Sequence, residues 1–82
     1  MTMNWSIEDA SASKEYGGDV FAKVERERRG SAFCWAAYKR LYGGRLDGTN
    51  YFMGQYAIRR GFADTMDDAM RACDAAMAER GF

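Results

Sequence analysis

Residues 65–82 carry the pattern that most restricts the fold of this chain, a complete amphipathic helix signal. Thr65 is suited to cap a helix, and Asp67 and Asp68 follow where the positive end of a helix favours acids. Gly81 is suited to the left-handed position that ends a helix. Apolar side chains recur between these ends with helical spacing, at Met66, Ala69, Met70, Cys73, Ala76 and Met77. The spacing predicts a helix over residues 65–80 whose alanine-rich stripe packs closely on another layer.

Three segments in the middle of the chain are candidates for that layer. Alternating patterns run over residues 20–25, 33–38 and 51–58, which is typical of strands, and their aromatic content favours the same structure. Arg28-Arg29-Gly30 is suited to a hairpin turn between the first two segments. We therefore predict an α+β fold, a three-stranded antiparallel sheet packed by one C-terminal α-helix.

The same segments allow a helical interpretation. Asp19, Ser31 and Thr49 are each suited to cap a short helix, and Gly43-Gly44 is suited to end one. The alternative fold is therefore an all-α bundle of four short helices. Periodicity alone does not assign short apolar segments, so both folds stay open at this point.

The length of 82 residues fits one small domain. We expect residues 1–18 to form an N-terminal arm, with a short helix as one interpretation, and residues 19–82 to form a single β-β-β-α domain. The start of the chain lacks the basic and apolar regions of a signal peptide, and no apolar run approaches the ~20 residues of a membrane span. We therefore expect a cytoplasmic protein without membrane contact.

The residue inventory argues against an enzyme. The chain has no His, which is the commonest general base and metal ligand, so Ser-His-Asp and Cys-His systems cannot form within it. The two cysteines, Cys34 and Cys73, stand far apart and do not make a zinc motif. The glycine-rich segment 43–48 lacks the Gly-Lys-Ser/Thr ending of a phosphate loop. We expect no catalytic residue, no metal site and no cofactor.

Charge is segregated along the chain although the net charge is zero. Residues 21–63 hold nine basic and three acidic residues, whereas residues 1–20 hold one basic and four acidic, and residues 64–82 two basic and five acidic. A basic sheet with exposed aromatic side chains suits a charged partner. The alternative is that the opposite charges meet within the fold. The candidate partner-binding residues are Arg28, Arg29, Trp35, Lys39, Arg59 and Arg60.

Two resemblances bear on function. The order of strands and terminal helix, with the spaced alanines Ala69, Ala72, Ala75 and Ala76, looks like part of a double-stranded RNA-binding domain. That family places lysines at the start of this helix to contact phosphate, whereas Met66-Asp67-Asp68 stands here and would repel phosphate. In size and layout the whole chain resembles small phage or prophage accessory proteins of the anti-CRISPR type, compact sheet-plus-helix domains that occlude a host nucleoprotein complex.

These observations together favour a non-catalytic protein-binding module. The anti-CRISPR resemblance implies an inhibitor of phage type, with a protein or nucleoprotein complex as its partner. The alternative is a nucleic-acid-binding module that uses a basic hairpin and sheet. An uncovered sheet edge also makes a homodimer a candidate assembly.

Overall fold

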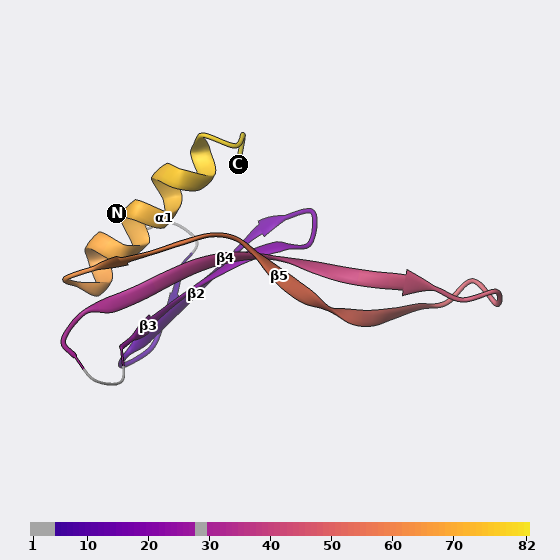
Figure 1. Cartoon of the computed structure of the whole chain (residues 1–82), viewed down its shortest axis with the longest axis horizontal. Coiled ribbons are helices and arrows are strands. Elements are labelled where there is room, and N and C mark those ends of the chain that lie inside the picture. Colours follow the sequence, from indigo (N-terminus) through magenta and orange to yellow (C-terminus); the bar gives the residue numbers. More distant parts are fainter. Residues whose placement is uncertain (1–4, 28–29) are drawn as a thin grey trace.

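The computed structural model describes residues 5–27 and 30–82, which form one sheet and one helix. The strands are β1 (Ser6–Ile7), β2 (Ser11–Gly17), β3 (Val20–Arg26), β4 (Phe33–Gly44) and β5 (Asn50–Ala63), and the helix is α1 (Met66–Ala78). The strands pair antiparallel in chain order, β1-β2-β3-β4-β5. Helix α1 packs across one face of this sheet and contacts β2, β3, β4 and β5 (Figure 1).

The structure corrects the predicted strand number. The fold is α+β, but the sheet has five strands rather than three, and the all-α bundle is wrong. The predicted middle segments do form β3, β4 and β5. The two further strands come from residues 6–17, which we expected to form an arm outside the sheet. The sequence of β2 lacks the apolar alternation that predicts a strand. Part of the inner face of β2 contacts α1 through hydrogen bonds and not through apolar packing.

The core lies between α1 and the inner face of the sheet. Cross-strand pairs such as Val24 with Trp35 and Ala22 with Ala37 place the alternating apolar residues of β3 and β4 on that face. The indole of Trp35 lies so close to Gly61 of β5 that a Cβ built there would be 2.8 Å from two ring carbons. The buried residues of the helix are those of its predicted stripe, Ala69, Met70, Cys73, Ala76 and Met77.

The predicted N-cap and the C-terminal glycine are confirmed, although the helix ends at Ala78 and not at residue 80. The Thr65 hydroxyl accepts a hydrogen bond of 3.0 Å from the Asp68 backbone N–H, as an N-cap does. Gly81 has φ +94°, and its N–H donates to Ala78 while the N–H of Phe82 donates to Met77. This pair of bonds is the Schellman ending, which satisfies the last carbonyls of the helix.

The carboxylate of Asp74 links Trp5 and β2 to α1 through hydrogen bonds. One oxygen accepts from Trp5 Nε1 at 3.0 Å, and the other accepts from Lys14 Nζ at 2.8 Å and from the Tyr16 hydroxyl at 2.7 Å. Three donors from separate points of the N-terminal third thus converge on one side chain. The outer strands are positioned by this polar cluster as well as by the sheet hydrogen bonds.

The ionisation of this cluster follows from its surroundings. Burial raises the pKa of the Asp74 carboxyl, whereas the hydrogen bonds from Lys14, Trp5 and Tyr16 lower it. The hydrogen bonds together have the larger effect, so the pKa lies below the ordinary value of 3.8. Burial also raises the pKa of the Tyr16 hydroxyl, as do its hydrogen bonds with Cys73 and Asp74. Asp74 is therefore the charged acceptor of the cluster, and Tyr16 is a neutral donor to it.

We expect Asp74→Asn to lower the free energy of unfolding by about 1–3 kcal/mol near neutral pH, because it weakens charge-assisted hydrogen bonds. The pKa of Asp74 is lower in the folded than in the unfolded chain, so its contribution is fully present above the ordinary value of 3.8 and is lost as pH falls through the folded pKa. Urea unfolding followed by circular dichroism at about pH 7 and about pH 3 measures this. The difference between wild type and variant should shrink at the lower pH, whereas the control Asp64→Asn, an exposed carboxyl before α1, should change little at either. A difference that does not vary with pH would contradict the role of the charge.

A second prediction concerns the contact between Trp35 and Gly61. In Gly61→Ala the new methyl group overlaps the indole ring of Trp35, which is buried in the core. We expect a loss of about 1–3 kcal/mol in urea unfolding, as for other overpacked cores. The matched control is Gly44→Ala, where the nearest atom to the new Cβ is Asn50 Oδ1 at 3.9 Å, and it should change stability by under about 0.5 kcal/mol. Equal effects at the two glycines would show that the indole can move.

Candidate protein-interaction surface

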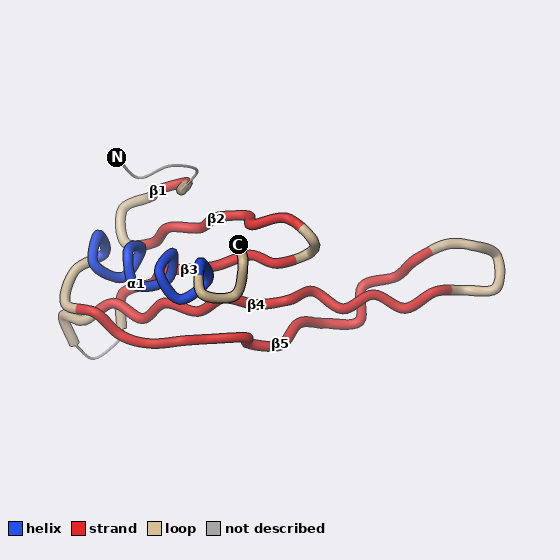
Figure 2. Tube along the Cα trace, turned by 90° about the horizontal axis from the view of Figure 1, so that it is seen from above, coloured by secondary structure: helices blue, strands red, loops and turns tan. Residues whose placement is uncertain are grey.

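Strands β4 and β5 continue far beyond the rest of the sheet. The pairing of β3 with β4 ends at Val20 and Lys39, whereas β4 pairs with β5 as far as Gly44 and Asn50. We call residues 41–56 the distal ribbon. Figures 1 and 2 show it projecting from the body as two strands and a turn, away from α1. Within the described residues, no third strand pairs with this part of β4.

The overall dimensions reflect this projection. The Cα atoms span 47 × 29 × 19 Å, with a radius of gyration of 14.3 Å. A compact domain of this length would have a radius of gyration of about 12 Å. The distal ribbon is therefore held out into solvent and does not fold back on the body.

The turn at the tip of the ribbon is fixed by local hydrogen bonds. The carboxylate of Asp47 accepts from the Thr49 N–H at 3.0 Å and from its hydroxyl at 2.7 Å, and these bonds lower the Asp47 pKa. Arg45 donates its N–H to Thr49, and Gly48 adopts φ +87°, which favours glycine. The segment that resembled an incomplete phosphate loop is thus a hairpin turn.

Aromatic side chains stiffen the two strands of the ribbon. The ring of Tyr51 lies over Gly43 of the opposite strand, where a Cβ would be 2.5 Å from it. Tyr42 and Phe52 meet edge to face across the strands, with ring centroids 5.8 Å apart. Such cross-strand pairs contribute roughly 0.2–1 kcal/mol each. The ribbon therefore has its own order, although it has no helix or third strand to cover it.

The distal ribbon exposes an unusual amount of apolar surface. Phe52 keeps 56% of its surface accessible, and Leu46 at the tip is fully exposed. Scattered apolar side chains are normal on protein surfaces, whereas a contiguous group of them marks an interaction site. The large apolar side chains exposed on the ribbon are Leu41, Tyr42, Leu46, Tyr51, Phe52, Met53 and Tyr56.

The distal ribbon is almost without charge. Its sixteen positions contain one basic residue, Arg45, and one acidic residue, Asp47, both in the turn. The Arg45 guanidinium lies 5.1 Å from the centroid of the Tyr51 ring. The apolar surface of the ribbon therefore carries no electrostatic field of one sign.

The outer face of the body sheet, opposite α1, is partly closed by its own side chains. Phe21 stacks on Tyr38 with ring centroids 5.3 Å apart, and the Arg40 guanidinium lies 4.2 Å from the Phe21 ring centroid. Arg40 donates two hydrogen bonds to the Glu15 carboxylate, at 2.8 and 2.7 Å, and this pairing lowers the Glu15 pKa. Phe21 is buried as a result, so this part of the basic segment does not present a free aromatic surface.

A hollow remains next to this closed patch. Its volume is about 510 Å³, and Lys23 and Arg60 flank it on either side of the small residue Ala36. Phe62 forms part of its wall and is exposed over 70% of its surface. The hollow mixes both charges, because Glu25 also lines it. It offers a shallow polar and aromatic surface without a gathered set of reactive groups.

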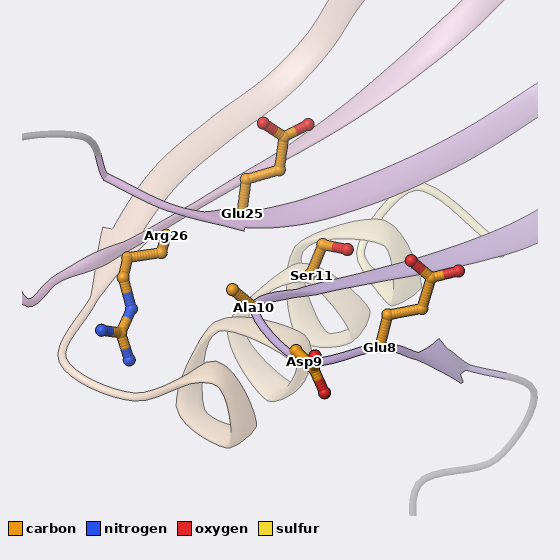
Figure 3. Close-up of a pocket in the computed structure, with 6 residues that line it drawn as sticks. All are labelled: Glu8, Asp9, Ala10, Ser11, Glu25 and Arg26. Carbon is orange, nitrogen blue, oxygen red and sulfur yellow. The ribbon is translucent and has the colours of Figure 1, made fainter.

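A second hollow lies where β1, β2 and β3 meet at the body end of the sheet (Figure 3). Figure 3 shows Glu8 and Glu25 pointing to one side of the strands, and Asp9 and Arg26 to the other. The charged groups therefore do not converge on one point. Among the residues that the structure describes, no three Cys, Asp or Glu side chains are grouped so that they could hold a metal ion.

The two cysteines differ in burial. Both are free thiols, with Cys34 half-buried on the outer face and Cys73 buried in the core. Burial raises the pKa of the Cys73 thiol. A nucleophilic cysteine needs a lowered pKa, so Cys73 acts as a small core residue.

The predicted contact residues do not gather in one place. Trp35 is only 7% exposed and faces α1, so it is absent from the accessible surface. Arg59 lies on the helix side, 3.7 Å from Glu79, whereas its neighbour Arg60 lines the outer hollow. Lys39 is exposed on β4 at the base of the ribbon. Arg28 and Arg29 lie outside the described residues.

The distal ribbon contains none of the predicted contact residues. The signal was present in residues 51–58, where apolar side chains occupy both parities of the alternation. A strand with one solvent-exposed face has apolar residues at every second position only. Two apolar faces, on a strand next to a turn, indicate either complete burial or a surface for a partner.

No helix in residues 5–27 and 30–82 is long and apolar enough to cross a membrane. No family model matches the chain, and neither curated proteins nor solved structures gave a match.

Proposed function

We propose that this protein is a non-catalytic protein-binding module and that the distal ribbon is its contact element. The observation that supports this is the gathering of exposed aromatic and aliphatic side chains on an ordered, projecting pair of strands. Tyr, Phe and Met are enriched at protein interfaces, where their burial provides most of the binding energy. A ribbon that is already ordered loses little conformational entropy on binding.

The charge of the ribbon favours protein over nucleic acid as the partner. Affinity for nucleic acid depends largely on lysine and arginine contacts to phosphate. The ribbon has a single arginine, and in the body Lys14, Arg40 and Arg59 are each paired with an acid. A stable nucleic-acid groove would need several free cations on one face. The nucleic-acid-binding alternative remains a prediction that salt dependence tests.

The more specific prediction, an inhibitor of phage type that occludes a nucleoprotein complex, remains part of the proposal. A narrow apolar ribbon held away from its own body has the shape to enter a cleft of a larger assembly. The contact would then be made by the protein component of that complex, since the ribbon has no set of phosphate-binding side chains.

The test is a capture experiment with matched variants. Wild type and the double variant Phe52→Asp, Tyr56→Asp are immobilised and exposed to a lysate of the cells that express the protein, and bound proteins are quantified by mass spectrometry. We expect the double variant to lose at least about tenfold of the specifically bound protein, because charges replace two interface aromatics. Phe62→Asp is the control, a more exposed aromatic on the body part of β5, and it should bind as wild type does.

Nuclease treatment and salt separate the two partner classes. Capture that survives nuclease digestion supports a protein partner. Direct binding of oligonucleotides by the wild type, with a steep loss of affinity as salt rises, would favour the nucleic-acid alternative. Equal capture by wild type and the ribbon variant would contradict the ribbon as contact element.

A further inference from the structure

We propose that the partner of the distal ribbon is a second copy of this chain, in a two-fold dimer whose contact is ribbon against ribbon. This inference rests on the proposed role of the ribbon as a protein-contact element, and it assigns that contact to a second copy instead of a cleft in a larger assembly. Three properties of the ribbon bear on it: the area it exposes, its charge, and its free strand edge.

The exposed area matches what a stable dimer needs. Taking about 200 Å² for each large side chain, the fractional exposures of the seven apolar residues of the ribbon amount to about 800 Å² per copy. A specific protein interface of standard size buries about 800 Å² on each partner. The ribbon therefore exposes an area of this size over its two faces together, with Phe52 on one face and Tyr51 and Tyr56 on the other.

The charge of the ribbon suits contact with itself. In a two-fold dimer the same surface patch occurs on both sides, so a patch with charge of one sign would repel its copy. The ribbon has only Arg45 and Asp47, which are opposite in sign and lie together in the turn. A strongly charged partner would require complementary charges on the ribbon. The ribbon has no excess of either charge. Self-contact is thus favoured over contact with a strongly acidic or basic protein.

The free edge of β5 supplies the backbone contacts. β5 is the last strand of the sheet in the described chain, and its outer edge is open along residues 50–63. Natural proteins guard such edges with proline or charged residues. The chain contains no proline, and residues 50–58 contain no charge, whereas Arg59 and Arg60 guard the body part of the same edge. The unguarded part of the edge therefore coincides with the apolar ribbon.

Pairing of β5 with its copy would also complete the ribbon as a sheet. Two antiparallel strands alone are marginally stable in water, and three or more with an apolar face are needed for independent stability. Two ribbons joined along β5 make four strands. A two-fold axis between identical strands gives antiparallel pairing, so both copies contribute the same residues. Placed near Gly54, the axis would bring residues 52–56 of the two copies side by side, with Arg59 and Arg60 beside the turn of the second copy.

The first experiment measures the oligomeric state of the untagged full chain. Sedimentation equilibrium over a concentration series should give a monomer–dimer equilibrium for wild type. Phe52→Lys with Tyr56→Lys should raise the dimer dissociation constant by at least about 30-fold, since aromatic anchors at the centre of an interface dominate its energy. Ile7→Lys, an exposed apolar residue on β1 at the opposite edge of the sheet, should leave the dissociation constant unchanged. Wild type that stays monomeric at every concentration would overturn the inference.

The second experiment tests that both sides of the contact are the ribbon. Phe52→Glu with Tyr56→Glu should also be monomeric, because the like charges of two copies would meet. An equimolar mixture of the lysine and glutamate double variants should form a heterodimer, since opposite charges then face each other across the axis. Circular dichroism of each variant alone confirms that the body is folded. Folded variants that fail to associate on mixing would contradict a ribbon-to-ribbon contact.

The two experiments also separate this inference from the proposed function. In one outcome wild type is monomeric, and the aspartate double variant no longer captures a protein of another sequence that wild type captures. The dimer proposal is then wrong, and the ribbon remains the contact element. If wild type dimerises and the ribbon variants do not impair either dimerisation or capture, both proposals fail. If the captured protein is this chain itself and the charge-swapped mixture associates, both are supported.

Discussion

The packing of α1 across the inner face of the sheet is the interaction on which the rest of the structure depends. The alanines of the helix stripe allow α1 and the sheet to lie close together. Gly61 in β5 leaves room for the indole ring of Trp35, which fills the space between the two layers. The helix is thirteen residues long and covers only the body half of the much longer β4–β5 hairpin. The other half of the hairpin receives no second layer. The division of the molecule into a packed body and an uncovered ribbon follows from this mismatch in length.

Local signals in the sequence predicted the elements whose stability is local. The helix was predictable because cap, apolar stripe and C-terminal glycine all agree, and the positions of β3, β4 and β5 were predictable from alternation. β2 was missed because its sequence is mostly Ser, Lys, Glu and Ala. This strand depends on pairing with β3 and on the bonds of Lys14 and Tyr16 to Asp74. Asp74 lies about sixty residues away in sequence, and alternation does not reveal these bonds.

Part of the charge segregation in the sequence is resolved by pairing within the fold. The acidic ends of the chain meet the basic middle within the fold, through Glu15 with Arg40 and Glu79 with Arg59. Adjacent arginines on β5 face opposite sides of the sheet, because successive side chains of a strand alternate. Trp35 was chosen as an exposed aromatic, and its parity on β4 instead points it into the core. The contact set could be judged only once register and the covered face were known.

The ribbon also shows why apolar residues on both parities of a strand are informative. Ordering a residue costs roughly 1–2 kcal/mol of backbone entropy, and burial of apolar surface normally offsets this. In the isolated chain the ribbon has only its ladder hydrogen bonds and a few cross-strand contacts, such as Tyr51 on Gly43, to set against that cost. The ribbon therefore contributes little net stability to the chain by itself. A partner that covers the ribbon would supply the burial of apolar surface that the isolated chain lacks.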